Sequence, residues 1–113
     1  MTSVHRDLTI EPGSYYSDQI TVKAAGQPYD LTGAVVRMQV RDYAGNLLLD
    51  LTEGNGAIEV TPTAGQIRRH FYATRTTGVK EKEGYYDLEI TPQNNPDLAF
   101  RIYHGKINFS RES

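Results

Sequence analysis

The sequence contains no cysteine and no tryptophan, and it holds only three phenylalanines. Without thiols the chain cannot form a disulfide bond or a thiolate metal site, although this absence does not fix the cellular compartment. No run approaches the ~18 apolar residues of a membrane helix, and residues 1–7 lack the apolar core of a secretion signal. We therefore expect synthesis in a cytoplasm, where the protein either stays or leaves as part of an assembly.

A large excess of charge of either sign is also absent. The formal net charge is −2 in 113 residues, which gives no general attraction for nucleic acid. The distribution is uneven, because residues 42–59 carry four acidic side chains and no lysine or arginine, whereas residues 66–82 carry five basic side chains and one acidic. We expect two neighbouring strands whose charges neutralise each other. The alternative is a pair of complementary patches that meet between subunits.

The residue patterns of common catalytic and metal sites are missing as well. The three histidines lie far apart in the sequence, without the spacing of zinc ligands. Ser14 stands outside a Gly-x-Ser-x-Gly elbow, and residues 53–56 lack the regular acidic spacing of a calcium loop. No phosphate-binding or dinucleotide-binding glycine pattern is present. We therefore expect a protein that is not an enzyme and that uses no cofactor and no metal.

The longest clean alternation of apolar and polar residues begins at Ala34. Every second residue from there to Val40 is apolar, while the opposite face carries Arg37, Gln39 and Arg41. Period two with one polar face predicts a half-buried strand, which we place centrally in a sheet at about 34–43. The loop at residues 44–46 predicts a hairpin with a partner strand at residues 47–51.

Shorter alternations predict the remaining elements. Arg69 interrupts one of them, and Ile107 and Phe109 have the opposite parity to Phe100 and Ile102, which requires an inserted residue. We expect that β-bulge at Gly105, and a helical turn or a mobile loop at residues 74–83. The further predicted strands cover residues 6–11, 15–24, 57–60, 66–73, 85–90 and 99–109, and the predicted core includes Met38, Val40, Leu49, Leu88 and Ile90.

About eight short strands separated by turn signals are typical of an all-β fold. We expect a single domain over residues 1–113 that forms an immunoglobulin-like antiparallel β-sandwich, with a small β-barrel as the alternative. The polar termini, residues 1–6 and 110–113, should be mobile in isolation and able to order against a neighbour. The first strand, residues 6–11, is short and charged, which is typical of a sheet edge.

Eight tyrosines are the main aromatic residues of the chain. The simpler interpretation is core packing with hydroxyls at the rim, and for the Tyr85–Tyr86 pair one ring inside and one outside. Exposed tyrosines and arginines are also favoured in protein interfaces, whereas stacking on sugars is less favoured without tryptophan. The residues that we predict as interface contacts are Tyr15, Tyr29, Tyr43, Tyr85, Arg68, Arg69 and Arg111.

Three segments together suggest a family. They are Pro-Tyr-Asp-Leu-Thr-Gly at 28–33, followed by a Val-Arg-Met-Gln-Val-Arg strand, Gly-Tyr-Tyr-Asp-Leu-Glu-Ile at 84–90, and Arg-Ile-Tyr-His-Gly-Lys-Ile at 101–107. In this order they resemble small β-sandwich structural proteins of tailed bacteriophages, such as the N-terminal domains of baseplate upper proteins and tail-fibre adaptors. The resemblance covers about residues 7–110. Its motifs are structural, and no catalytic residue carries over.

The resemblance implies a compact virion component, made in the host cytoplasm and located in the phage tail. Such a protein would act by contacts with other virion proteins and with copies of itself, without nucleic acid or membrane as partner. Two alternatives stay open. One is an immunoglobulin-like module that binds carbohydrate or a cell surface. The other is a host adhesion domain, which should need an export signal.

Overall fold

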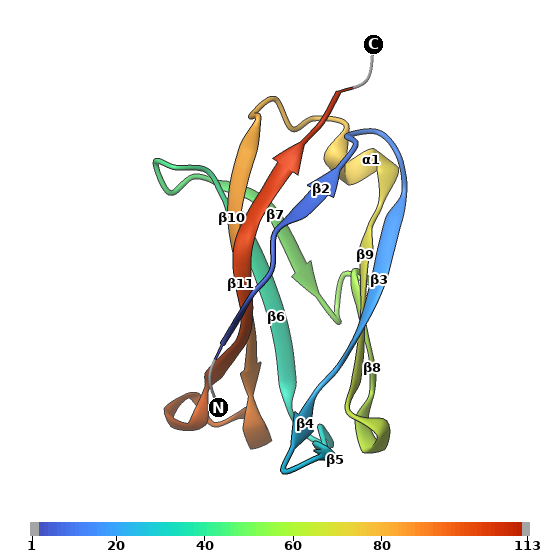
Figure 1. Cartoon of the computed structure of the whole chain (residues 1–113), viewed down its shortest axis with the longest axis vertical. Helices are drawn as coiled ribbons and strands as arrows, with labels where there is room; N and C mark the ends of the chain where they lie inside the picture. The colour runs from blue at the N-terminus through green and yellow to red at the C-terminus, as the bar shows by residue number, and fades with distance from the viewer. Residues whose placement is uncertain (1–2, 112–113) are drawn as a thin grey trace.

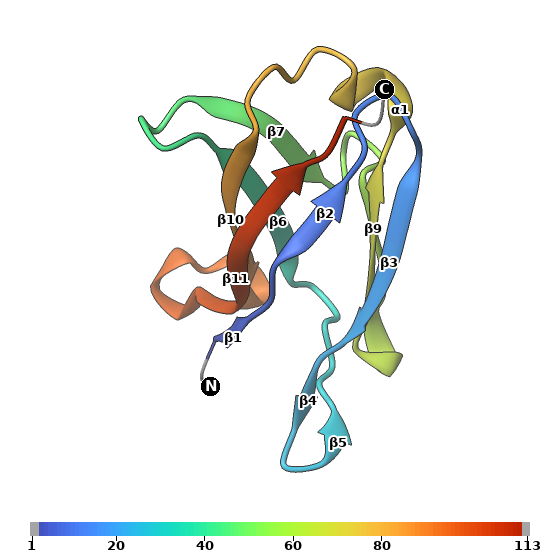
Figure 2. The same cartoon turned by 45° about the horizontal axis from the view of Figure 1, so that its top comes forward.

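A computed structural model describes residues 3–111 and forms two facing β-sheets (Figures 1 and 2). The larger sheet has the strand order β1-β11-β10-β6-β7, with β2 also paired to β11, and the smaller sheet has the order β3-β9-β8. In chain order the elements are β1 (Val4–His5), β2 (Leu8–Ile10), β3 (Tyr16–Thr21), β4 (Lys23–Ala24), β5 (Gln27–Pro28), β6 (Val35–Arg41), β7 (Leu47–Thr52), β8 (Ile58–Thr61), η1 (Pro62–Ala64), β9 (Gln66–Phe71), α1 (Ala73–Thr76), β10 (Glu83–Thr91), η2 (Pro92–Asn94), η3 (Pro96–Leu98) and β11 (Phe100–Phe109).

The sheet order has the immunoglobulin-like pattern expected from the sequence. Strands β11, β10, β6 and β7 lie side by side in one sheet, and β3, β9 and β8 form the other, as in variable-type immunoglobulin domains. Strands β1 and β2 differ from the antiparallel rule because they pair with β11 in parallel. Across the described residues the two sheets stay separate and keep free edges, so the barrel alternative is wrong.

The core lies between the sheets and is organised by β6 and β10. Their antiparallel register sets Leu88 opposite Met38 and Tyr86 opposite Val40. Alternate residues of both strands are buried, because a strand directs successive side chains to opposite faces. Tyr85 points outward while Tyr86 is buried, as predicted. The five predicted core residues, Met38, Val40, Leu49, Leu88 and Ile90, are all buried, which confirms that register.

The predicted strand at residues 15–24 is interrupted. β3 ends at Thr21, and the chain then enters the β4–β5 hairpin, which projects beyond the two sheets (Figure 2). Val22 donates its N–H to the carbonyl of Gly65 at 2.7 Å. A Cβ at Gly65 would lie 2.7 Å from two backbone oxygens, so this crossing requires glycine. The predicted end of the strand, Ala24, therefore lies in the exposed hairpin and outside the core.

The predicted bulge in the last strand exists, but it lies at Ile102. Leu88 pairs with Tyr103 and the next residue, Glu89, pairs with Arg101, so Ile102 is the inserted residue. The placement at Gly105 is wrong. A Cβ at Gly105 would lie 2.1 Å from the carbonyl oxygen of Arg6. Glycine at this position therefore allows the N-terminal segment to pass close to β11.

The predicted helical turn after residue 73 is also present. It forms α1, whose Thr76 side chain is buried and accepts a hydrogen bond from the N–H of Gly13 at 2.9 Å. The contact joins α1 to the loop between β2 and β3 (Figure 1). No helix among residues 3–111 has the length and apolar character needed to cross a bilayer.

Both described ends of the chain are held by hydrogen bonds. β1 pairs with β11 at the edge of the larger sheet, and Arg6 donates its N–H to His104 at 2.8 Å. The edge position was predicted, but the N-terminal arm belongs to the sheet from Val4 onward. Arg111 donates to the backbone carbonyls of Val79 and Glu81, so the expectation of a mobile Arg111 is wrong. The rest of the predicted arms, 1–2 and 112–113, lies outside the described residues.

Candidate functional site

The outer face of the larger sheet is hollowed between β6, β10, β11 and the N-terminal segment. The hollow has a volume of about 750 Å³, which is within the range of small-molecule sites, and most of the residues that line it have charged or polar side chains. The strand register sets its side chains in rows across the sheet. The rows are Arg37 and Glu89; Gln39, Asp87 and His104; and Arg41, Tyr85 and Lys106.

Opposite charges balance in this hollow. Its lining includes three cationic side chains, Arg37, Arg41 and Lys106, and three carboxylates, Asp7, Asp87 and Glu89. The ion pairs around it are exposed and long: Arg37 lies 3.4 Å from Asp50, and Arg101 lies 3.2 Å from Asp87. Such surface pairs contribute about 0–1 kcal/mol to stability. These side chains can therefore change partners on docking at little cost.

The N-terminal segment forms one wall of the hollow through Asp7. Its carboxylate accepts the backbone N–H of Lys106 at 2.8 Å and contacts Nε2 of His5 at 2.8 Å. These hydrogen bonds lower the pKa of Asp7, with the backbone bond as the largest cause. The rings of His5 and His104 lie 5.1 Å apart beside it. Asp7 thus joins His5 of the N-terminal segment to the backbone of β11 at this side of the hollow.

Apolar side chains are exposed at the hairpin end of the same face. Tyr43 is 93% exposed, Leu47 49% and Tyr85 42%, and the rings of Tyr43 and Tyr85 lie 6.4 Å apart. Arg41 pairs in register with both Leu47 and Tyr85, and it donates to the Gly45 carbonyl at 3.0 Å. Tyrosine and arginine are the residues that dominate binding energy in interfaces. We call Tyr43, Leu47, Tyr85 and Arg41 the aromatic cluster.

The structure brings only two of the predicted interface residues together, Tyr43 and Tyr85. Arg68 belongs to β9 of the smaller sheet, where its side chain donates to Gln19 at 3.0 Å, and Tyr15 lies just before β3. The Tyr29 ring packs against Phe100 with 5.8 Å between ring centres. Arg111 binds the backbone after α1. The predicted set therefore does not form one surface.

Arg69 was predicted as a surface contact, and this prediction is wrong. Its side chain is fully buried and donates from Nε to Asp18 at 2.8 Å and from Nη2 to the second Asp18 oxygen. The guanidinium also lies over the Tyr86 ring, 5.4 Å from its centre. Burial alone acts to lower the pKa of Arg69, but the hydrogen bonds and charge of Asp18 outweigh it and raise the pKa. The residue that interrupts the apolar alternation in β9 is therefore one half of a buried ion pair with Asp18.

A histidine cluster on the smaller sheet was not predicted. The Nδ1 atom of His70 lies 2.7 Å from the Tyr15 hydroxyl, and its Nε2 atom contacts Glu59. The Tyr72 ring stacks on His70 at 5.3 Å. Glu59 also pairs in register with Arg68, which supports neutralisation of the two charge blocks within the chain. Because both ring nitrogens of His70 are occupied, we interpret this cluster as structural.

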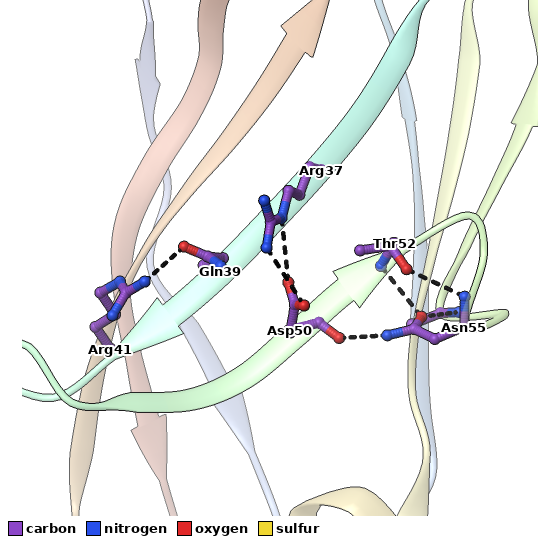
Figure 3. A network of polar contacts seen from close by, with 7 residues as sticks. Arg37, Gln39, Arg41, Asp50, Thr52 and Asn55 are labelled. Carbon is purple, nitrogen blue, oxygen red and sulfur yellow. Dashed lines mark hydrogen bonds and ion pairs between the residues drawn. The ribbon is translucent and has the colours of Figure 1, made fainter.

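A second, smaller hollow of about 240 Å³ lies where Leu48 and Leu51 of β7 approach Thr76 of α1. Its lining is mostly apolar, with Arg75 also contributing. The edge of β7 nearby is contacted by Asn55, a residue that sequence reasoning missed (Figure 3). An Asn-Gly pair in a polar loop is the signal that could have drawn attention to it. Among residues 3–111, no group of three or more histidine or acidic side chains could hold a metal ion.

Comparison of the sequence with models of known protein families found no match, and a search of curated proteins found none.

Proposed function

We propose that this protein is a non-enzymatic structural component of a tailed-phage virion that acts through protein–protein contacts. The observation that carries the docking role is the aromatic cluster beside a hollow on an exposed sheet face. The assignment to a tail, baseplate or fibre adaptor rests on the resemblance of residues 28–33, 84–90 and 101–107. The partners on this proposal are other virion proteins, and the location is the virion.

The shape of the face indicates what kind of partner it suits. A hollow facing its own copy would enclose empty space, whereas close packing is needed for affinity. The partner should therefore present a convex element with polar groups of both signs. Tyr43 and Tyr85 would anchor it at the rim, because large aromatic side chains contribute most to such interfaces.

Mass spectrometry of purified tails tests the virion assignment, and variants test the surface. We expect the double variant Tyr43→Ala/Tyr85→Ala to fold normally by circular dichroism and to be lost from tails. Tyr15→Ala is the matched control, because Tyr15 is 55% exposed and lies before β3, outside the lining of the hollow. Absence of the wild-type protein from particles would overturn the virion assignment. Equal incorporation of the double variant and the control would overturn the docking surface.

Glycan binding is the second candidate, and the lining of the hollow favours it. Planar polar groups such as those of Gln39, Asp87 and Arg37 surround the hollow, and Tyr85 offers a ring face. A glycan array with the wild-type protein and Asp87→Ala distinguishes the two candidates. Specific binding that the Asp87 variant loses would support this alternative, and an array without any specific binding would remove it.

A further inference from the structure

β7 is the last strand of the larger sheet, and its free edge is partly covered by one side chain. The carboxamide of Asn55 donates from Nδ2 to the carbonyl of Asp50 at 2.7 Å and accepts the N–H of Thr52 at 3.1 Å (Figure 3). Its oxygen also accepts the N–H of Ala57 at 3.0 Å, and the Asn55 N–H donates to the Thr52 hydroxyl at 3.1 Å. The loop after β7 therefore folds back onto the strand edge.

The two contacts to the strand backbone have the pattern of sheet pairing. In an antiparallel ladder the N–H and C=O of one residue point to the same side, and alternate residues point to opposite sides. Asp50 and Thr52 thus face away from β6, toward the place where a further strand would lie. The Asn55 carboxamide supplies one donor and one acceptor, which a neighbouring strand would otherwise supply. The Asn55 side chain therefore lies where the backbone of a further strand would pair with β7.

The other half of the edge lacks this cover and is apolar. Leu47 is 49% exposed at the start of β7, and Tyr43 projects from the adjoining hairpin with 93% of its surface exposed. Asp50 is the only charged residue among Leu47–Thr52, and Arg37 already pairs with it. A free, mainly apolar edge with a single charge lacks the lysines and prolines that protect natural edge strands from pairing.

We propose that the β7 edge is a strand-pairing site whose occupant is β7 of a second copy of this chain, and that Asn55 competes with it. The pairing is antiparallel about a two-fold axis, as closed dimers require. Each copy contributes one carboxylate to the pair of strands, that of Asp50. If the two-fold axis passes through any other β7 residue, the two Asp50 side chains do not lie opposite each other, so their repulsion does not prevent the pairing. The inference rests on the proposed function in that both invoke contacts between proteins, and the edge shares Leu47 and Tyr43 with the aromatic cluster. Asn55 lies outside both that cluster and the lining of the hollow, so its variant tests the edge alone.

Sedimentation velocity over a range of protein concentrations tests the competition. Asn55→Ala removes the carboxamide, and we expect its dimer to form at about tenfold lower concentration than that of the wild type, because hydrogen bonds to the loop no longer compete. Adding Leu47→Lys should abolish the dimer by setting cations at the paired edge. Val35→Lys is the matched control, since Val35 is exposed on β6 away from this edge.

Hydrogen exchange of the wild-type protein provides a second measurement that needs no variant. The Asp50 amide should exchange more slowly as concentration rises, while the amide of Thr77, which follows α1 and donates to the Ala73 carbonyl, should not change. An Asn55→Ala variant that is folded but no more associated than wild type would overturn the proposal, as would a concentration-independent Asp50 amide. Either result would leave the docking surface at Tyr43 and Tyr85 untouched, because that surface is tested by incorporation into tails.

Discussion

At the scale of single residues, the alternation of apolar side chains predicts the core correctly but does not reveal the buried ion pair between Arg69 and Asp18. Alternation alone identified Met38 and Leu88 as core residues, because apolar burial follows directly from strand periodicity. The same rule failed at Arg69, since its partner Asp18 lies on another strand, 51 residues away in the chain. Local patterns carry no information about such a distant partner.

The ion pair makes a prediction about stability. Asp18→Ala should cost about 3–5 kcal/mol of unfolding free energy, because it leaves the buried guanidinium of Arg69 without its partner. The paired replacement Asp18→Val/Arg69→Met should cost much less, because it removes both charges together. Urea unfolding measures both values. A loss below about 1 kcal/mol for Asp18→Ala would mean that water or another group satisfies Arg69.

The lowered pKa of Asp7 predicts that the stability of the fold depends on pH. Its hydrogen bonds from Lys106 and His5 place the folded pKa below the unfolded value, so its contribution to stability is present above the unfolded pKa, about 3.9. That contribution is lost as the pH falls through the folded pKa. Asp7→Asn should therefore melt at a lower temperature than wild type near neutral pH, and the difference should shrink in acid. A difference that does not change with pH would refute this role.

At the scale of elements, the type and order of most strands were predictable from the sequence, whereas the positions of interruptions and bulges within them were predicted less accurately. The β6–β7 hairpin and the helical turn of α1 follow from alternation and turn residues. The parity change in β11 required a bulge, but glycine was a misleading marker of its position. Gly105 serves the passage of Arg6, a contact between the two ends of the chain. Sequence reasoning can detect that an element is irregular without finding the tertiary contact that explains its glycine.

The role of Gly105 can be tested directly. Gly105→Ala should lower the unfolding free energy by about 1–3 kcal/mol or more, because the added methyl group meets the Arg6 backbone. The amides of Arg6 and Lys106 should lose protection from hydrogen exchange, since their bonds join the N-terminal segment to β11. Gly78→Ala is the control, because no atom lies within 4 Å of its added Cβ. Equal stability of the two variants would contradict the packing argument.

At the scale of the whole molecule, the sandwich was predictable and the site was not. The number and spacing of short strands indicated two sheets, whereas the hollow joins residues as distant as Arg41 and Lys106 through strand register. Each predicted interface tyrosine was plausible alone. Only the fold separates Tyr43 and Tyr85, which lie together on one face, from Tyr15, which lies just before β3 and contacts His70 of the smaller sheet.

Tyrosine footprinting of the free protein and of the same protein in assembled tails tests the proposed docking face most directly. The account predicts that Tyr43 and Tyr85 react readily in the free protein and become protected in the tail, because they anchor the partner at the rim of the hollow. Tyr15, which is also exposed, should keep its reactivity in both states. Protection of Tyr15 together with unchanged reactivity of Tyr43 and Tyr85 would contradict the account.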